Sequence, residues 1–340
     1  MAERTSGIAL SEEFFRTGVQ PLLDRGRPDL PYAAALLGRG SEVLGFDDAM
    51  STDHDWTARV TVLLDPDAAD QVDGVRSMIT EAVPSALGEV PTAVEVATLD
   101  GYVRAQLALE IDEDWDAFDW LSLPTLRLAA LTGGVVHHDE IGLREVRDRL
   151  AWYPRDVWLY LLAAGWWRVH PELNLVGRSG WAGDELGSAV MAGGIVADLM
   201  HLAFLIERRH APYRKWFGTA FSRLEIAGSL GPHLDRAVAA TAWTERQEAL
   251  GEAYTVVAAA FDRLQLVDPL PLETVRMWDR PFTVPWADYP SLLTAEITDP
   301  AVRSLMAQWP PLSGVDRVRD LLWAPQHRAA IRALCAHGTA

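Results

Sequence analysis

Two aspartates separated by one residue, Asp53 and Asp55, are the side chains in this sequence best suited to chemistry. They directly precede an alternating apolar segment, and alternate residues of a strand point to the same face, so both carboxylates would share a face. Neighbouring carboxylates repel each other unless a cation neutralises them. Oxygen ligands on a rigid strand suit Mg²⁺, which takes its remaining ligands from water and nucleotide phosphates. The pair therefore predicts a magnesium site that takes a nucleotide.

A Gly-Ser turn, Gly40 and Ser41, precedes the aspartates by eleven intervening residues. Glycine lets the backbone approach a phosphate, and the amides and hydroxyl of a following helix start can donate hydrogen bonds to it. We expect the phosphates of the nucleotide at this turn.

A third carboxylate is expected from a neighbouring strand, and Glu95 is the best candidate. In AVEVA, Val94 and Val96 face one way and Glu95 faces the other among small alanines. An acid there would complete a two-metal clamp or act as a base on an attacking hydroxyl. Each motif also has a purely structural interpretation. The two aspartates could be solvated acids of a turn, and Glu95 could be an exposed residue of an edge strand. His54, between the aspartates, is expected to have a structural role. The ordered combination is more specific than its parts.

The segments that must position these residues form an α/β first half. Helices are expected over 11–23, 32–37 and 68–86. Strands are expected over 56–65 and 91–103, where β-branched residues alternate with polar ones or cluster between Pro91 and Gly101.

Long helical patterns replace the strand signals from about Trp120 onward. The sequence therefore predicts an α+β protein, with a domain of strands and helices over 1–145 and a mostly helical domain over 146–340. Tryptophans in this second half are expected to be core residues, since aromatics at helical spacing usually pack inside.

Composition narrows the functional classes. The chain has 340 residues, of which 49% are hydrophobic, enough for a packed core. A net charge of −18 disfavours a large nucleic-acid footprint, which depends on Lys and Arg. The one cysteine, Cys335, cannot form an internal disulfide or a Cys-rich zinc site.

Nothing in the sequence favours a membrane or secreted protein. The N-terminal segment is acidic where a signal peptide would be basic, and the longest apolar stretch, 186–209, contains Asp198 and His201. We therefore expect a cytoplasmic protein in which that stretch is a buried helix.

The ordered motifs resemble those of the DNA polymerase β-like nucleotidyltransferase superfamily, through Gly40, Ser41, Asp53 and Asp55. Further segments look like an uncharacterised group within it that carries a domain of unknown function behind the catalytic core: DWLSLP, YPRDVW, GDELG and APYRKWFGTAF. The resemblance covers most of the chain. It implies a small mixed sheet, Mg²⁺ on the aspartates with two ions when nucleotide is bound, and a helical domain over the nucleotide. Arg39 departs from the family, where a small residue often precedes the Gly-Ser, and it would add a phosphate contact or narrow the turn.

The segment WAGDE, 181–185, is similar to one in streptomycin and spectinomycin adenylyltransferases that presents an acid to the substrate. Their strand glutamate base is similar to Glu95 in VEVAT. The resemblance implies that Asp184 or Glu185 meets the acceptor and that Glu95 takes its proton. Asp184 also suits the N-cap of a helix beginning at Glu185.

Lys215 is the only lysine in the chain. In related enzymes a basic residue of the helical domain grips the triphosphate, which implies that role for Lys215. The alternatives are Arg208, Arg209 or Arg214, and a plain surface lysine.

The leading expectation is an Mg²⁺-dependent enzyme that moves an NMP, AMP from ATP first among the candidates, onto a small molecule. The alternatives are nucleotidylation of a protein or tRNA, adenylation of a carboxylate, and a catalytically silent nucleotide-binding module. The acceptor and the oligomeric state are left open.

Overall fold

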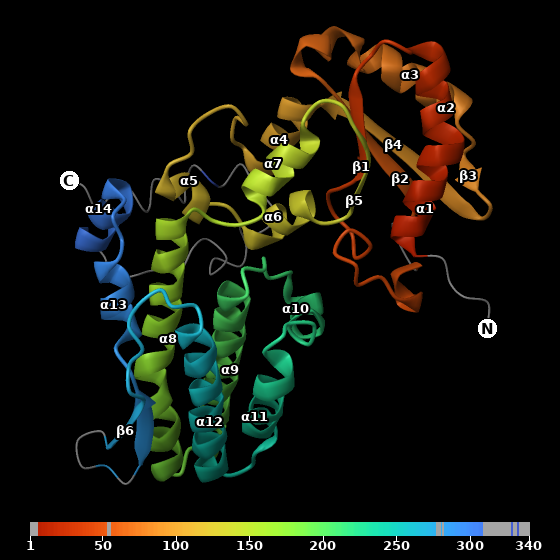
Figure 1. The fold of residues 1–340 in the computed structure, drawn as a ribbon. Helices are drawn as coiled ribbons and strands as arrows, with labels where there is room; N and C mark the ends of the chain where they lie inside the picture. Colours follow the sequence, from red (N-terminus) through yellow and green to blue (C-terminus); the bar gives the residue numbers. More distant parts are fainter. Residues whose placement is uncertain are drawn as a thin grey trace. The chain divides into compact units, whose positions relative to one another are not determined.

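A computed structural model describes residues 6–52, 56–276, 280, 282–308, 328 and 332 (Figure 1). Contacts divide the chain into two compact units. The first contains the chain up to Trp115 and the segment Leu123–Trp152; the second contains Asp116–Ser122 and Tyr153–Arg319. The main division therefore falls between residues 152 and 153, compared with the expected position near 145.

The first unit is built on a mixed five-stranded sheet in the order β3-β4-β2-β1-β5. Strands β2 and β4 are parallel, whereas β1 runs antiparallel to both β2 and β5, and β3 runs antiparallel to β4. Together with the helical second unit, this sheet confirms the predicted α+β class. The strands are β1 Tyr32–Leu36, β2 Ala58–Leu64, β3 Ala86–Leu87, β4 Val90–Thr98 and β5 Val135–Asp139.

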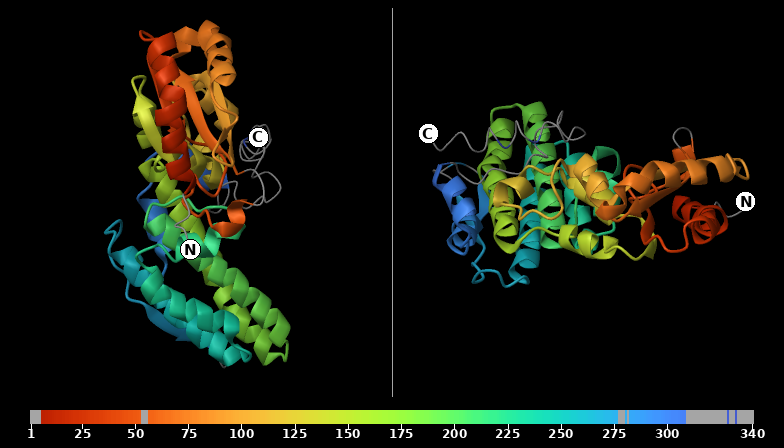
Figure 2. Two further views of the ribbon diagram at one scale, coloured as in Figure 1. Left: turned by 90° about the vertical axis from the view of Figure 1, so that its right-hand side faces the viewer. Right: turned by 90° about the horizontal axis from the view of Figure 1, so that it is seen from above.

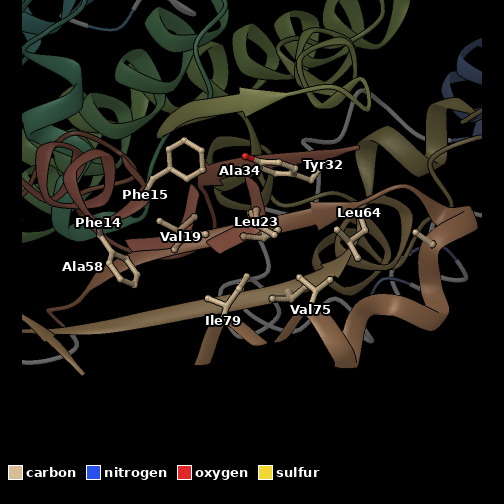
Figure 3. Close-up of a cluster of buried hydrophobic side chains, with 14 of the residues drawn as sticks. Phe14, Phe15, Val19, Leu23, Tyr32, Ala34, Ala58, Leu64, Val75 and Ile79 are labelled. Carbon is tan, nitrogen blue, oxygen red and sulfur yellow. The ribbon is translucent and has the colours of Figure 1, made fainter. Parts of the chain in front are cut away.

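A hydrophobic core lies between one face of this sheet and the helices α1, α2 and α3 (Figure 3). Val60, Val62 and Leu64 of β2 point into it, so Arg59 and Thr61 lie on the opposite face. This alternation frees one sheet face for polar residues. The helices of the unit are α1 Gly7–Phe14, the π-helical η1 Phe15–Val19, α2 Gln20–Gly26, the 3₁₀ segments η2 Ala49–Thr52 and η3 Pro66–Gln71, α3 Val72–Ala82, α4 Leu99–Leu107, α6 Thr125–Thr132 and α7 Leu143–Leu150.

The predicted helix over 32–37 is wrong, because Tyr32–Leu36 is the strand β1. Alanine has the highest helix propensity, but β1 lies between β2 and β5 and all five of its residues are buried. Small side chains fit such a crowded strand, and tertiary pairing overrides helix propensity.

Two other predicted boundaries also move. The first helical stretch begins at Gly7 instead of residue 11, and Ser6 Oγ caps it by accepting a hydrogen bond from the Ala9 amide. The strand expected over 91–103 ends at Thr98, which caps helix α4 by accepting from the Gly101 amide.

The second unit is mostly helical, with α8 and α9 packed side by side and α12 against both (Figure 2). Trp166 on α8 is fully buried, with its ring 4.8 Å from that of Tyr289 and 5.1 Å from that of Tyr254, centre to centre. This tryptophan is a core residue, as expected, but the expectation is wrong for Trp167 and Trp181 of the same helix, which are 50% and 65% exposed. The elements are α5 Ala117–Leu121, α8 Arg155–Trp181, α9 Glu185–Ile206, α10 Arg214–Phe221, α11 Ala227–Ala239, α12 Trp243–Asp262, β6 Glu273–Arg276, β7 Thr283–Trp286, α13 Tyr289–Ala295 and α14 Pro300–Gln308.

Helix α9 is, among the described helices, the one long and apolar enough to cross a membrane, with a mean hydropathy of 2.0. Its interior carries Asp198, which is paired with Arg168 of α8 at 3.2 Å. In this structure α9 packs against α8, α11 and α12 as a core helix of the second unit.

Candidate functional site

The Gly-Ser turn lies at the end of the sheet where β2 begins. Strands β1 and β2 are antiparallel, with Ala35 opposite Thr61, so the chain leaves β1 beside the first residues of β2. Asp53 and Asp55 precede β2 in the sequence, but they and His54 lie outside the described residues. The structure therefore positions the turn at the start of β2 and gives no geometry for the aspartate pair.

Arg59, the second residue of β2, joins the strand to the turn. Its Nε and Nη2 donate to Glu42 Oε1 at 3.0 and 2.8 Å, and Nη2 also donates to the Arg39 carbonyl. Glu42 is only 8% exposed, so this is a largely buried ion pair. Sequence reasoning missed both residues, although Glu42 directly follows the Gly-Ser and Arg59 is the one charged residue of its strand.

Gly40 is required by the turn itself. Its φ of +137° lies in the region that favours glycine, and a Cβ there would stand 2.2 Å from Glu42 Oε1. The structure thus explains this glycine by the close approach of the Glu42 carboxylate. The predicted approach of a phosphate stays a prediction.

Ser41 is not followed by the expected helix start; residues 41–45 form turns. Its hydroxyl donates to Ser51 Oγ at 3.1 Å, and Ser51 Oγ donates to Asp48 Oδ1 at 3.0 Å. These bonds tie the turn to the 3₁₀ segment that immediately precedes Asp53. The predicted cradle is therefore a hydrogen-bonded loop and not a helix N-terminus.

Glu95 lies in the middle of β4, opposite Thr61 in the parallel pair. Val94 and Val96 pack in the hydrophobic core on one face of the sheet, so Glu95 points to the opposite face, as expected. Solvent reaches the carboxyl, but the surrounding protein removes part of its hydration and raises its pKa, against the opposing charges of Arg59 and Arg76. A carboxyl with a raised pKa is suited to proton transfer.

Two further polar residues lie near Glu95 and the turn. Tyr102 on α4 is buried, its hydroxyl is hydrogen-bonded to Thr61, and burial and the Glu95 charge raise its pKa. Arg127 on α6 is also buried and donates from Nη1 to Gln106 Oε1 at 2.9 Å. Burial and the nearby Arg39 lower the pKa of Arg127, so positive charge is concentrated at this turn. Neither residue stands out in the sequence.

The predicted acceptor acids belong to the second unit, and both have structural partners. Asp184 is the N-cap of α9, accepting from the Gly187 amide at 2.7 Å, as its structural alternative predicted. Glu185 accepts from Arg246 Nη1 at 2.5 Å, and this hydrogen bond lowers the pKa of Glu185. Arg246 also donates to Ser188 Oγ, which joins α12 to the start of α9.

Lys215 is the second residue of α10 and is exposed, with its Nζ 4.7 Å from the ring centre of Trp216. Arg208, one of its alternatives, is also exposed and lies over the ring of Trp158 at 4.2 Å. Both cations therefore make the same kind of contact, and the assignment of Lys215 to the triphosphate stays a prediction.

Within the described part of the chain, no group of three or more His, Cys, Asp or Glu side chains is arranged to hold a metal ion. The carboxylates of the turn region already accept hydrogen bonds: Glu42 from Arg59, Asp48 from Ser51 and Asp47 from the Gly7 amide. The metal hypothesis stays with Asp53 and Asp55, as predicted from the sequence.

Comparison with known proteins gives limited matches. A family model described as a domain of unknown function, DUF4037, matches residues 120–217, which include the segments 153–158 and 183–187. None of the curated proteins matches the sequence. Among solved structures, a nucleotidyltransferase-like protein from Exiguobacterium sibiricum is 10% identical, with 75% of this chain and 78% of that chain covered and a TM-score of 0.33. Similarity at this level does not assign a reaction.

Proposed function

We propose that this protein is an Mg²⁺-dependent nucleotidyltransferase that moves an NMP from an NTP, with ATP as first candidate, onto a small molecule. One observation carries the proposal. Arg59 holds the turn over residues 38–42 against the first residues of β2, so the Gly-Ser motif lies beside the strand that follows the D-x-D motif in the sequence.

The nucleotide would be held by the turn and the aspartates together. Gly40, Ser41 and Arg39 are assigned to the phosphates, and Asp53 and Asp55 would hold Mg²⁺. The ion would neutralise charge on the phosphates during transfer. Lys215 is assigned as the cation that the helical unit contributes to the triphosphate.

Glu95 is assigned as the base. The acceptor hydroxyl gives its proton to the Glu95 carboxylate, and the acceptor oxygen forms a bond to the α-phosphorus. The bond between the α-phosphorus and the bridging oxygen breaks, and pyrophosphate leaves with that electron pair. The raised pKa of Glu95 and its place on the open sheet face support this role. Its other predicted role, as a third metal ligand beside Asp53 and Asp55, is the alternative assignment for the same carboxylate.

Asp184 and Glu185 keep the proposed acceptor contact as a secondary role. Each carboxylate has two oxygens, and capping or pairing with Arg246 leaves further acceptor positions.

The test is pyrophosphate release from each of the four NTPs with Mg²⁺ and a panel of acceptors. Asp53→Asn and Asp55→Asn should each lower turnover at least about 100-fold, while the exposed control Asp70→Asn should not. Unchanged turnover in the two site variants would refute the assignment. Metal-dependent thermal stabilisation by an NTP without any turnover would point to a silent nucleotide-binding module instead.

A further inference from the structure

The first turn of helix α1 packs against the loop that links β1 to β2. A Cβ built on Gly7 would stand 2.4 Å from the Cβ of Glu42 and 3.2 Å from the ring of Trp56, so glycine allows this close approach. The Gly7 amide also donates to Asp47 Oδ2 at 3.1 Å. Residues on both sides of the candidate aspartates in the sequence therefore contact the start of α1.

Ser11, one helical turn beyond Gly7, reaches the start of β2. Its side chain is fully buried, and its Oγ donates to the Arg59 carbonyl at 2.7 Å. The pairing between β1 and β2 ends at Thr61, two residues from Arg59. The Ser11 hydroxyl therefore holds the backbone of β2 just outside this pairing, at the residue whose side chain holds the turn.

His137 of β5 makes a second hydrogen bond to Ser11, with its Nε2 2.8 Å from Oγ. The register between β1 and β5 shifts between Ala34 and Ala35, which leaves His137 as the extra residue of a bulge. A bulge re-aims a side chain. Here the imidazole stacks on Phe15, with the ring centres 5.3 Å apart, and its edge meets the Ser11 hydroxyl.

The chemistry of these groups fixes the direction of both hydrogen bonds. A carbonyl oxygen only accepts, so the single Ser11 proton goes to the Arg59 carbonyl, and Ser11 Oγ accepts from His137 Nε2. Burial lowers the pKa of His137, against the charge of Glu12, so the ring is neutral at pH 8 with its proton on Nε2. The hydrogen bonds therefore run from His137 to Ser11 and from Ser11 to Arg59.

We propose that Ser11 and His137 are positioning residues for the nucleotide site. They hold the backbone of Arg59, whose side chain in turn holds Glu42 and the Arg39 carbonyl of the turn. The role rests on the proposed function for the identity of the ligand, and on the contacts of α1 and β5 for the ordering of the turn. Without these hydrogen bonds the turn should open locally while the sheet stays folded.

Hydrogen exchange of the full chain tests this ordering without requiring activity. The Gly45 and Phe46 amides bond to carbonyls of the turn region, and Ser11→Ala should speed their exchange at least about tenfold. Thr17→Ala is the matched control, because it removes an exposed hydroxyl that bonds only to the carbonyl one turn earlier in the same helical stretch. Unchanged exchange at the turn in Ser11→Ala, or an equal acceleration in the core of β2, would overturn the proposal.

Two substitutions of His137 test its hydrogen bond to Ser11. His137→Gln keeps an N–H donor near the position of Nε2 and should keep the parent exchange rates, whereas His137→Leu should speed exchange at the turn at least about threefold. Nitrogen-15 spectra of the histidine-labelled parent at pH 8 should show His137 protonated at Nε2, with its signal identified by its loss in His137→Gln. A proton on Nδ1, or equal exchange rates in the two variants, would contradict the assigned role.

Turnover separates this proposal from the proposed function. If the parent releases pyrophosphate, Ser11→Ala should lower kcat at least about tenfold, because a displaced turn misaligns the phosphates, and Thr17→Ala should not. An unchanged kcat in Ser11→Ala would overturn the positioning role. A parent that turns over none of the NTPs would refute the proposed function, and the exchange rates at the turn would still decide whether Ser11 and His137 order it.

Discussion

Glu95 combines a raised pKa with a position open to solvent, which gives its carboxyl an effect on stability as well as a proposed role in proton transfer. Its folded pKa is above the unfolded value of about 4.3, so the folded state binds this proton more tightly. The free energy of unfolding therefore falls as the pH rises through the interval between the two values.

Glu95→Gln removes this pH-dependent fall in the free energy of unfolding, because glutamine carries no charge to desolvate. We expect the variant to unfold at a higher temperature than the parent at pH 8, with the difference shrinking toward pH 4, while turnover falls at least about 100-fold. Differential scanning calorimetry at the two pH values measures the first effect. Glu89→Gln, an exposed glutamate between β3 and β4, is the control and should change neither property.

His170 predicts a second pH dependence, in the helical unit. Its Nε2 lies 2.6 Å from the Tyr254 hydroxyl, its ring stacks on Trp286, and burial lowers its pKa to about 4. The unfolded chain takes up this proton near pH 6.5, so stability is full above that pH and falls by about 3 kcal/mol on acidification to pH 4.

Urea unfolding of the parent and of His170→Gln at pH 7 and pH 4.5 measures the contribution. Glutamine can still bond to Tyr254 but does not titrate, so the variant should lose less stability between the two pH values, by about 2 kcal/mol. An equal loss in both proteins would show that His170 is not the group responsible.

At the scale of elements, the turn between β1 and β2 is fixed by the Glu42–Arg59 pair. Glu42→Gln leaves a cation without its carboxylate, which costs about 3 to 5 kcal/mol in a buried pair, and about 2 kcal/mol here because Arg59 is 25% exposed. Chemical unfolding measures the cost. Asp73→Asn breaks the exposed Arg76–Asp73 pair on α3 and should cost less than about 1 kcal/mol. Equal costs would mean that Glu42 does not hold the turn.

These same elements show what the sequence could and could not predict. The alternation in β2 and the apolar period of α9 reflect local chemistry, so both were predicted near their observed bounds. Strand β1 was misread because its burial comes from β2 and β5, which lie far away in the sequence. The Arg59 contact with Glu42 joins residues 17 apart and has no local signal. Asp53 and Asp55 were identified as candidates from their spacing in the sequence alone. Tyr102 and Arg127 could be identified only from the folded structure, which brings them near Glu95 and the turn.

At the scale of the whole molecule, Lys215 of the helical unit tests the proposed role of that unit in nucleotide binding. Lys215 is exposed and is the only lysine in the sequence, so every other Lys or Arg position of the helical unit is an arginine. If it binds the triphosphate, Lys215→Ala should weaken ATP about tenfold, since a charge-assisted hydrogen bond contributes about 1.5 to 3 kcal/mol. AMP, which lacks the β- and γ-phosphates, should bind equally to the parent and the variant.

Isothermal titration of ATP and AMP in the presence of Mg²⁺ separates these cases, with the exposed Arg178→Ala on α8 as the control for general loss of positive charge. Equal weakening by both variants would indicate nonspecific electrostatic attraction to an acidic protein, which falls as salt is raised. A selective loss of ATP affinity in Lys215→Ala would instead support the proposed contact between this side chain and the triphosphate. An unchanged ATP affinity would leave nucleotide binding to the sheet unit, and the helical unit would then serve the acceptor.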